Sequence, residues 1–266
     1  TLAVFLTAAA ALISVSAQAQ RSGPRSGEMF GGPPAARNVA GQFDYYALVL
    51  SWSPTHCATV SLSDNDPQCN RRDGHRYAFV LHGLWPQHDR GYPEYCAIRG
   101  RPFVPQPVID GMLDIMPSPK LVIHEFRKHG VCTGLGAVEY FALSRRLFDR
   151  IKIPQDYVNP FENRMVGPDQ VMDEFLAANP DLKPDMLAVA CGGSGNRLRE
   201  VRICFSRTGD LRPCGYNEDQ RRLCSAQRVF VPPVRATGSE PARQPDARCD
   251  IKAPLPGPRA GPGVGR

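Results

Sequence analysis

Four of the six histidines of this chain fall in two short stretches, LHGLWPQHDR (81–90) and IHEFRKHGVC (123–132). The second stretch also carries a glutamate, a lysine and a cysteine. Imidazoles gain and lose protons near neutral pH, so two of them facing one cleft would form an acid–base pair. Proton transfer is therefore the chemistry that these residues suggest first.

The second stretch has the spacing of a functional helix face. His124 and Lys128 are four residues apart, as are Glu125 and His129, so each pair shares a face and the two faces adjoin. A buried helix would not carry four such groups unpaired, and a solvated face does not require two histidines. The pattern favours a site that uses an imidazole, a carboxylate, an ammonium and a second imidazole together.

Zinc binding is the main competing explanation, because His-Glu opens the metalloprotease signature. That signature needs histidines four residues apart, whereas His124 and His129 are five apart. Five residues turn a helix by about 500°, which leaves the two rings about 140° apart and unable to share one metal. The chain also has no Cys-x-x-Cys pair. We expect neither a metal nor a cofactor.

An acid–base pair without its own nucleophile suits a substrate that carries one. RNA is such a substrate, because one imidazole can take the 2′-hydroxyl proton while the other protonates the leaving 5′-oxygen. Lys128 would stabilise the phosphoryl oxygens. Trp85 offers a face to a base, although a core tryptophan explains it equally well. Which imidazole acts first stays open.

The elements that must position these groups follow from apolar spacing. Since Gly83 and Pro86 follow His82, we expect His82 at a strand end. Pro119 suits the first position of a helix and Gly130 its cap. CGGSGN (191–196) lacks the Lys-Ser/Thr of a phosphate loop and reads as a hairpin turn. We predict strands at 43–52, 75–85, 185–191, 198–205 and 227–231, and helices at 106–117, 119–130, 137–151 and 167–180. The class is α+β, with a central antiparallel sheet and packed helices.

Both ends of the chain differ from its middle. Residues 1–19 are apolar and uncharged and end in Ala-Gln-Ala, which predicts a signal peptide rather than a membrane anchor. Residues 20–42 and 232–266 are rich in Gly, Pro and Arg and predict a linker and a disordered tail. One domain at 43–231 remains. It holds 23 basic and 22 acidic residues, so the net charge of +6 belongs mostly to the ends and does not indicate polyanion binding.

Nine cysteines after a secretion signal predict disulfides in an oxidising compartment. Eight cysteines allow about a hundred pairings, so residue spacing cannot choose among them. Cys249 lies in the tail and is the expected odd one. We expect a secreted or periplasmic protein that is monomeric and leaves the membrane once the signal is removed.

The motifs FVLHGLWPQ (79–87) and HEFRKHGVC (124–132) resemble the active-site segments of the T2-type ribonucleases, and FDYYALVLSW (43–52) resembles their opening strand. The resemblance covers about residues 43–231. It implies the disulfide-stapled α+β fold of that family and metal-independent cleavage of single-stranded RNA to 2′,3′-cyclic phosphates and then 3′-phosphates. The implied catalytic residues are His82 and His129 as the acid–base pair, His124 on the phosphate, and Glu125 and Lys128 on the pentacovalent state.

The resemblance also implies a base-binding site formed by Trp85, Tyr92 and Gln87. Phe126 stands where the family usually has tryptophan, and Gln87 where some members have an acidic residue or asparagine, which leaves base preference open. The implied disulfides are Cys57–Cys69, Cys96–Cys132, Cys191–Cys224 and Cys204–Cys214, with Cys249 unpaired. Two other functions stay open: an inactive relative that binds RNA or protein, and an unrelated disulfide-rich binding module with incidental histidines.

Overall fold

A computed structural model describes residues 38–61, 64–71, 73 and 75–234. The expected signal peptide at 1–19, most of the linker at 20–42, Cys249 and most of the tail at 232–266 lie outside the described residues. Among the residues that are described, no helix is long and apolar enough to cross a membrane.

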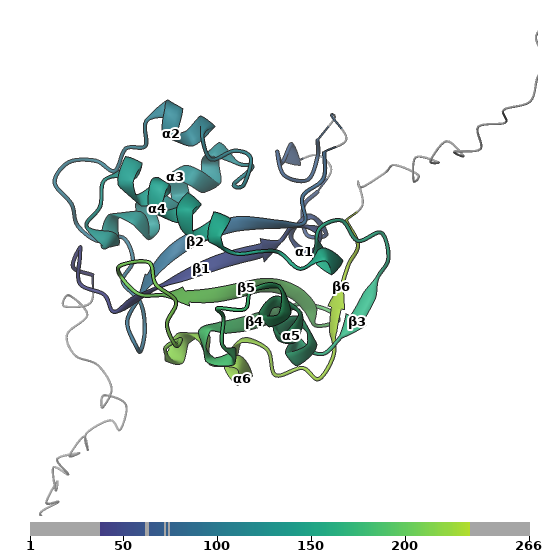
Figure 1. The fold of residues 1–266 in the computed structure, drawn as a ribbon. Coiled ribbons are helices and arrows are strands. Elements are labelled where there is room, and N and C mark those ends of the chain that lie inside the picture. The colour runs from purple at the N-terminus through teal and green to yellow at the C-terminus, as the bar shows by residue number, and fades with distance from the viewer. Residues whose placement is uncertain (1–37, 62–63, 72, 74, 235–266) are drawn as a thin grey trace, which may run out of the picture. The chain divides into compact units, whose positions relative to one another are not determined.

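One six-stranded sheet organises the fold (Figure 1). Its order is β2-β1-β5-β6-β3, and β4 also pairs with β5. The pairing is antiparallel except between β5 and β6, so the expected antiparallel sheet is correct apart from this one short contact. The strands are β1 (Tyr45–Trp52), β2 (Phe79–Gln87), β3 (Arg164–Val166), β4 (Leu187–Gly192), β5 (Arg197–Phe205) and β6 (Val229–Val231).

Two groups of helices accompany the sheet in Figure 1. Helices α3 and α4 contact β2, with α2 beside them, whereas α5 and α6 contact β4. Four 3₁₀ turns lie at 130–133, 155–157, 184–186 and 216–218. The helices are α1 (Ser53–Cys57), α2 (Gln106–Asp110), α3 (Pro119–Lys128), α4 (Ala137–Arg150), α5 (Pro168–Ala178) and α6 (Gln220–Leu223).

The core explains why β1 is central. Every residue of β1 except Ser51 is buried, because the strand has a neighbour on each side and α4 packs near it. The apolar stripe of α4 buries Tyr140, Phe141 and Leu147. The Tyr140 hydroxyl donates to the Leu84 carbonyl at 2.9 Å, which joins α4 to β2. This contact fixes the strand that carries His82 relative to the helical layer.

Several element ends differ from the sequence prediction. Helix α2 stops at Asp110, and hydrogen-bonded turns replace it through Met116. Gly130 does not cap α3 but opens a 3₁₀ turn, and Gly134, with φ of 79°, is the left-handed residue. The short elements α1, β3 and α6 were not predicted, because three to five residues are too few to show a periodicity. The hairpin turn expected at 191–196 does join β4 to β5.

Four disulfides staple these elements. The bridge between Cys96 and Cys132 joins the loop after β2 to the 3₁₀ turn after α3, so it ties together the two histidine-bearing segments. The bridges are Cys57–Cys69, Cys96–Cys132, Cys191–Cys224 and Cys204–Cys214, the same four pairs that the family resemblance implies.

Candidate active site

His82 does not end a strand, as its neighbours suggested, but lies inside β2. In the register with β1, Val49 pairs with Gly83 and Leu50 with Leu81, so His82 is the extra residue of a β-bulge. A bulge bends the strand and re-aims one side chain. Pro86 does not break the strand, because β2 is at the sheet edge, where a missing N–H costs no ladder bond.

The imidazole of His82 lies between two buried carboxylates. Its Nδ1 is 3.3 Å from Oε1 of Glu200 on β5, and its Nε2 is 3.6 Å from Oε1 of Glu125 on α3. Burial lowers the pKa of His82, but the hydrogen bond with Glu200 and the charges of both carboxylates outweigh it and raise that pKa above its ordinary value. The site therefore favours a protonated His82.

Glu125 is placed by helix α3. Ser118 caps this helix by accepting a hydrogen bond from the Leu121 amide, and Pro119 occupies its first position. The Glu125 side chain is only 1% exposed, and its Oε2 accepts a hydrogen bond from Nε1 of Trp85 at 2.7 Å. Burial raises the pKa of Glu125 to about 7. This carboxyl therefore titrates near neutral pH.

Trp85 contacts both histidines of the expected acid–base pair. Its ring centroid is 5.1 Å from that of His82, edge to face, and 4.9 Å from that of His129, stacked at 22°. The Arg202 guanidinium lies 5.0 Å from the indole. Both imidazoles of the expected acid–base pair thus lie in contact with one indole. Its role as a base platform stays a prediction, and these neighbours already cover part of the indole.

His129 is buried and neutral. It follows the last turn of α3, where its amide donates to the Glu125 carbonyl at 2.9 Å. Burial and the positive charges of Lys128, His82 and His124 lower the pKa of His129 to about 3. Its Nδ1 has no hydrogen-bond partner among the residues that the structure describes. An imidazole in this state can accept a proton at any pH above about 3.

His124 and Lys128 complete the set of polar residues that the sequence predicted. Burial and the charges of Lys128 and His82 lower the pKa of His124, so these groups act on one another electrostatically. The Lys128 ammonium is 3.6 Å from a carboxylate oxygen of Glu94. Partly exposed ion pairs of this kind contribute little stability. Lys128 can therefore exchange Glu94 for another anion.

The two remaining base-site residues have different surroundings. Tyr92 is 47% exposed, and its ring centroid is 6.5 Å from that of His129. Gln87 is buried, and its Oε1 accepts a hydrogen bond from the Asn217 amide at 2.9 Å. Asn217 also binds backbone atoms of His88 and Gly91. Gln87 and Asn217 thus hold the loop that presents Tyr92, while direct contact of Gln87 with a base stays a prediction.

The sequence reasoning missed Glu200 and Arg202. Both charges lie in LREVRICF (198–205), on a strand whose other residues are largely apolar and buried. Residues two apart on a strand share a face, and charged residues are seldom buried unless they are paired. Two opposite charges two residues apart on an otherwise largely apolar strand are the sequence pattern that could have identified Glu200 and Arg202.

A cluster of possible metal ligands at His56, Asp66 and Cys69 is not a site. The Cys69 sulfur is bonded to Cys57, so it has no thiolate to offer. His56 Nε2 lies 3.4 Å from the Asp66 carboxylate, an ordinary surface pair.

Gly83→Ala is expected to destabilise the protein by about 1–3 kcal/mol, because overpacking a filled site has this cost. A β-carbon at Gly83 would lie in the space of the Glu125 carboxylate, and 2.7 Å from Nε1 of Trp85. Thermal unfolding and tryptophan fluorescence measure the effect. In the control Gly167→Ala the nearest atom is the Gln227 carbonyl oxygen at 3.5 Å, an ordinary contact. Equal stability of the two variants would contradict this packing.

A family model and several known proteins match this chain. The family model described as "Ribonuclease T2 family" matches residues 43–214. A ribonuclease of Aeromonas hydrophila is 43% identical over 119 residues, which are 45% of this chain and 51% of that protein. A probable ribonuclease of Haemophilus influenzae is 29% identical over 190 residues, with coverage of 67% and 63%. The chain thus spans less than two thirds of the length of either relative.

Solved structures show the same fold. RNase NT in complex with 5′-AMP superposes with a TM-score of 0.56 at 20% identity, over 72% of this chain and 99% of that one. Trichomaglin, described as an S-like ribonuclease, gives a TM-score of 0.58 at 20% identity, over 73% and 100%. The predicted α+β fold is confirmed by these likenesses.

Proposed function

We propose, from the premise that this chain belongs to the ribonuclease T2 family, that it cleaves single-stranded RNA by transesterification to a 2′,3′-cyclic phosphate and then hydrolysis to a 3′-phosphate. Family membership confirms the motif resemblance and excludes an unrelated binding module. One observation carries the proposal: two imidazoles lie against one indole, one with a raised pKa and the other with a lowered pKa.

The opposite pKa shifts favour one order of proton transfer in the first step. His129 is neutral and would accept the 2′-hydroxyl proton, whereas His82 is protonated and would deliver a proton to the leaving 5′-oxygen. In the second step the roles reverse, since water replaces the leaving group and the cyclic ester opens. Both steps move protons between these two rings and the substrate.

The charge that builds on the phosphoryl oxygens needs donors. Lys128 would leave Glu94 to stabilise that charge, and His124 would bind the phosphate. Glu125 is protonated below its pKa of about 7 and would then donate a hydrogen bond to an oxygen of the pentacovalent state. These groups supply the stabilisation without a metal ion, so chelation of metals is expected to leave cleavage unchanged.

The end groups of the products test the reaction. The oxidised full chain is incubated with RNA and EDTA at pH 5 to 7, and the fragments are analysed by mass. Ends with 2′,3′-cyclic phosphate that convert slowly to 3′-phosphate support the proposal. RNA that is bound but left intact would instead indicate an inactive relative, and 5′-phosphate ends would indicate a different nuclease mechanism.

The pH profile of kcat/KM is expected to fall on the alkaline side at the pKa of His82, which lies above 6.5, because the acid loses its proton there. On the acidic side, protonation of His129 removes the base only near pH 3. Activity should therefore persist through the mildly acidic range. Cleavage of a dinucleotide measured from pH 3 to 9 checks this, and an acidic limb centred near pH 6.5 would contradict His129 as the base.

The base beside the cleaved bond would stack on Tyr92, which is exposed and held by the Asn217 network. RNase NT and an RNase MC1 variant are solved with 5′-AMP and 5′-UMP respectively. These complexes support a nucleotide site on the shared fold. In this chain, Trp85 and Gln87 would also line that site.

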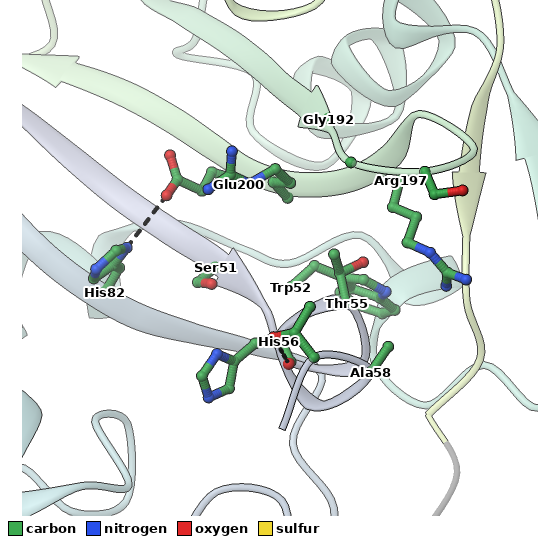
Figure 2. A pocket seen from close by; sticks show the side chains of 13 residues that line it. Ser51, Trp52, Thr55, His56, Ala58, His82, Gly192, Arg197 and Glu200 are labelled. Carbon is green, nitrogen blue, oxygen red and sulfur yellow. Dashed lines mark hydrogen bonds and ion pairs between the residues drawn. The ribbon is translucent and has the colours of Figure 1, made fainter. Parts of the chain in front are cut away.

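A cavity of about 520 Å³ is lined by His82 and Glu200. Figure 2 shows His82 and Glu200 at one end of it and Arg197 at the other, with Ser51 and His56 between. Because His82 would protonate the leaving oxygen, the next nucleotides of the strand would run through this cavity. Arg197 lies at its far end and Arg199 is also among its lining residues, and neither forms an ion pair within the described part of the chain.

Arg197→Ala is therefore expected to raise the KM for an RNA of several nucleotides about 3- to 10-fold and to reduce the salt dependence of binding by about one charge. A dinucleotide should be unaffected, since it is too short to reach this residue. Arg207→Ala serves as the control, because Arg207 lies over Phe43, outside the cavity. Equal KM changes for the dinucleotide and the longer RNA would contradict this strand path.

The four disulfides support action outside the reducing cytosol, as secreted and periplasmic proteins keep such bonds. We further propose that the protein acts there as a monomer on single-stranded RNA.

A further inference from the structure

Glu200 is the closest charged group to the imidazole of His82. Its Oε1 is 3.3 Å from Nδ1, whereas Glu125 stands 3.6 Å from Nε2 on the opposite edge of the ring. Figure 2 shows the contact between Glu200 on β5 and His82 on β2, two strands that both pair with β1. An ionised carboxylate can only accept, so Nδ1 must carry the hydrogen. Nε2 is then the nitrogen that faces the substrate.

The carboxylate of Glu200 is itself held in place by Arg202 of the same strand. Arg202 donates to its Oε2 through Nε at 3.0 Å and Nη2 at 2.8 Å. The third nitrogen of Arg202 lies 3.6 Å from the buried Glu218, which accepts a hydrogen bond from the Tyr45 hydroxyl. A network of this kind leaves Glu200 one orientation. The network connects Tyr45, a buried residue of β1, with His82.

The two carboxylates beside His82 are in different protonation states. Burial raises the pKa of Glu200, but the hydrogen bond from His82 and the charge of Arg202 lower it to about 2. Burial raises the pKa of Glu125 to about 7. Between pH 3 and 6 Glu200 is therefore the negative charge that accompanies His82, while Glu125 is largely protonated.

We infer that Glu200 is a positioning residue for the general acid: it fixes the tautomer of His82, aims Nε2 at the leaving oxygen and stabilises the imidazolium. This inference rests on the proposed function of the site. In the reaction, the Nε2 proton passes to the 5′-oxygen as the O–P bond breaks, and His82 becomes neutral. Glu200 keeps the Nδ1 proton in place throughout and gains or loses none.

Other charges near His82 do not replace Glu200. Glu125 faces the other ring nitrogen, Arg202 carries the wrong sign, and His56 of α1 only shares a cavity wall. Lys128 on α3 carries the wrong sign to stabilise an imidazolium, and His129 after it is neutral. The charged and titratable groups around the ring are Glu125, His124, Lys128 and His129 on the helical side and Glu200 and Arg202 on the sheet side.

Two substrates separate positioning of the acid from a structural role. Cleavage of a dinucleotide releases the 5′-nucleoside, whose alkoxide is a poor leaving group and needs the proton of His82. Cleavage of a nucleoside 3′-(4-nitrophenyl phosphate) releases a stable phenolate, which needs no proton. Glu200→Gln should lower kcat for the dinucleotide by about 10- to 100-fold, the range seen when a carboxylate that orients a histidine is lost. The aryl ester should lose less than about 3-fold. Equal losses on both substrates would overturn the inference.

A second measurement does not depend on cleavage. In the ¹⁵N-histidine spectrum of the full chain, Glu200→Gln should lower the pKa of His82 and shift protons from Nδ1 toward Nε2. An unchanged pKa and tautomer would overturn the inference. If the wild-type protein cuts no RNA but Glu200→Gln still changes the pKa and tautomer of His82, the proposed function fails. The inference that Glu200 orients His82 is then still supported.

Two further variants guard against a folding artefact. Glu200→Asp keeps the charge at a greater distance, so it should fold and give a smaller change in the same direction on both readouts. Glu174→Gln removes a comparable carboxylate that is bonded to a tyrosine and an arginine away from the site, and it should leave kcat and the His82 signals unchanged. An effect of Glu174→Gln as large as that of Glu200→Gln would assign the result to general destabilisation.

Discussion

His129→Ala is expected to lower kcat for RNA cleavage by about 10³- to 10⁴-fold while the chain stays folded. The surroundings of His129 hold it neutral at mildly acidic pH, since burial and three nearby positive groups lower its pKa to about 3. Without it, no imidazole near the indole can accept the 2′-hydroxyl proton. Initial rates on a dinucleotide at pH 5 to 7 measure the loss.

His82→Ala should show a loss of similar size on the dinucleotide, and the aryl ester should recover much of it, because that ester leaves without a proton. His75→Ala is the matched control: His75 is exposed, and its ring packs against that of Tyr77. Thermal unfolding of all three variants checks the fold. Activity of His129→Ala within about tenfold of wild type would show that another group takes the proton and would refute the assignment.

A single 2′-deoxynucleotide placed in an RNA strand is expected to block cleavage after that nucleotide completely and to leave the neighbouring bonds cleavable. The protein supplies protons and charge stabilisation in the proposed reaction, and the ribose supplies the attacking oxygen. Removing that oxygen removes the nucleophile but hardly changes the charge or shape that the site binds. The missing band in a gel of end-labelled fragments gives the result directly.

The same oligonucleotide provides its own control, because cleavage at the other positions proves that the enzyme binds it and is active. A fully deoxy strand should compete with RNA without being cut. Cleavage at the deoxy position would mean that water or a protein group attacks the phosphorus. That outcome would refute the 2′-hydroxyl mechanism, although the position of the two imidazoles against Trp85 would be unaffected.

The His82 side and the Lys128 side of the site differ in how far their groups are buried and paired. Around His82 the groups are buried and paired, with Glu200, Arg202 and Glu218 in one network. On the side where the phosphate is proposed to bind, Lys128 is partly exposed and pairs with Glu94. In the proposed reaction the general acid is thus preorganised, whereas Lys128 would exchange a partner when substrate binds. Kinetic effects at the His82 end should accordingly fall on kcat.

Local patterns in the chain were enough to predict the helix that carries His124, Glu125 and Lys128, because i, i+4 spacing and a proline at the first helical position depend only on neighbours. They also predicted the hairpin between β4 and β5 and most strands. They misjudged His82, since a bulge is defined by the register against β1, and no residue within β2 records that register.

Only the tertiary structure could bring Glu200 to His82, because the two are 118 positions apart and meet through the pairing of β2 and β5 with β1. The same holds for Asn217 behind Gln87, and for the indole of Trp85 against both imidazoles. The pKa shifts follow from these contacts, since burial and neighbouring charges come from every element that packs at the site. Residue type and spacing thus name the reacting groups, while long-range packing decides which of them carries the proton.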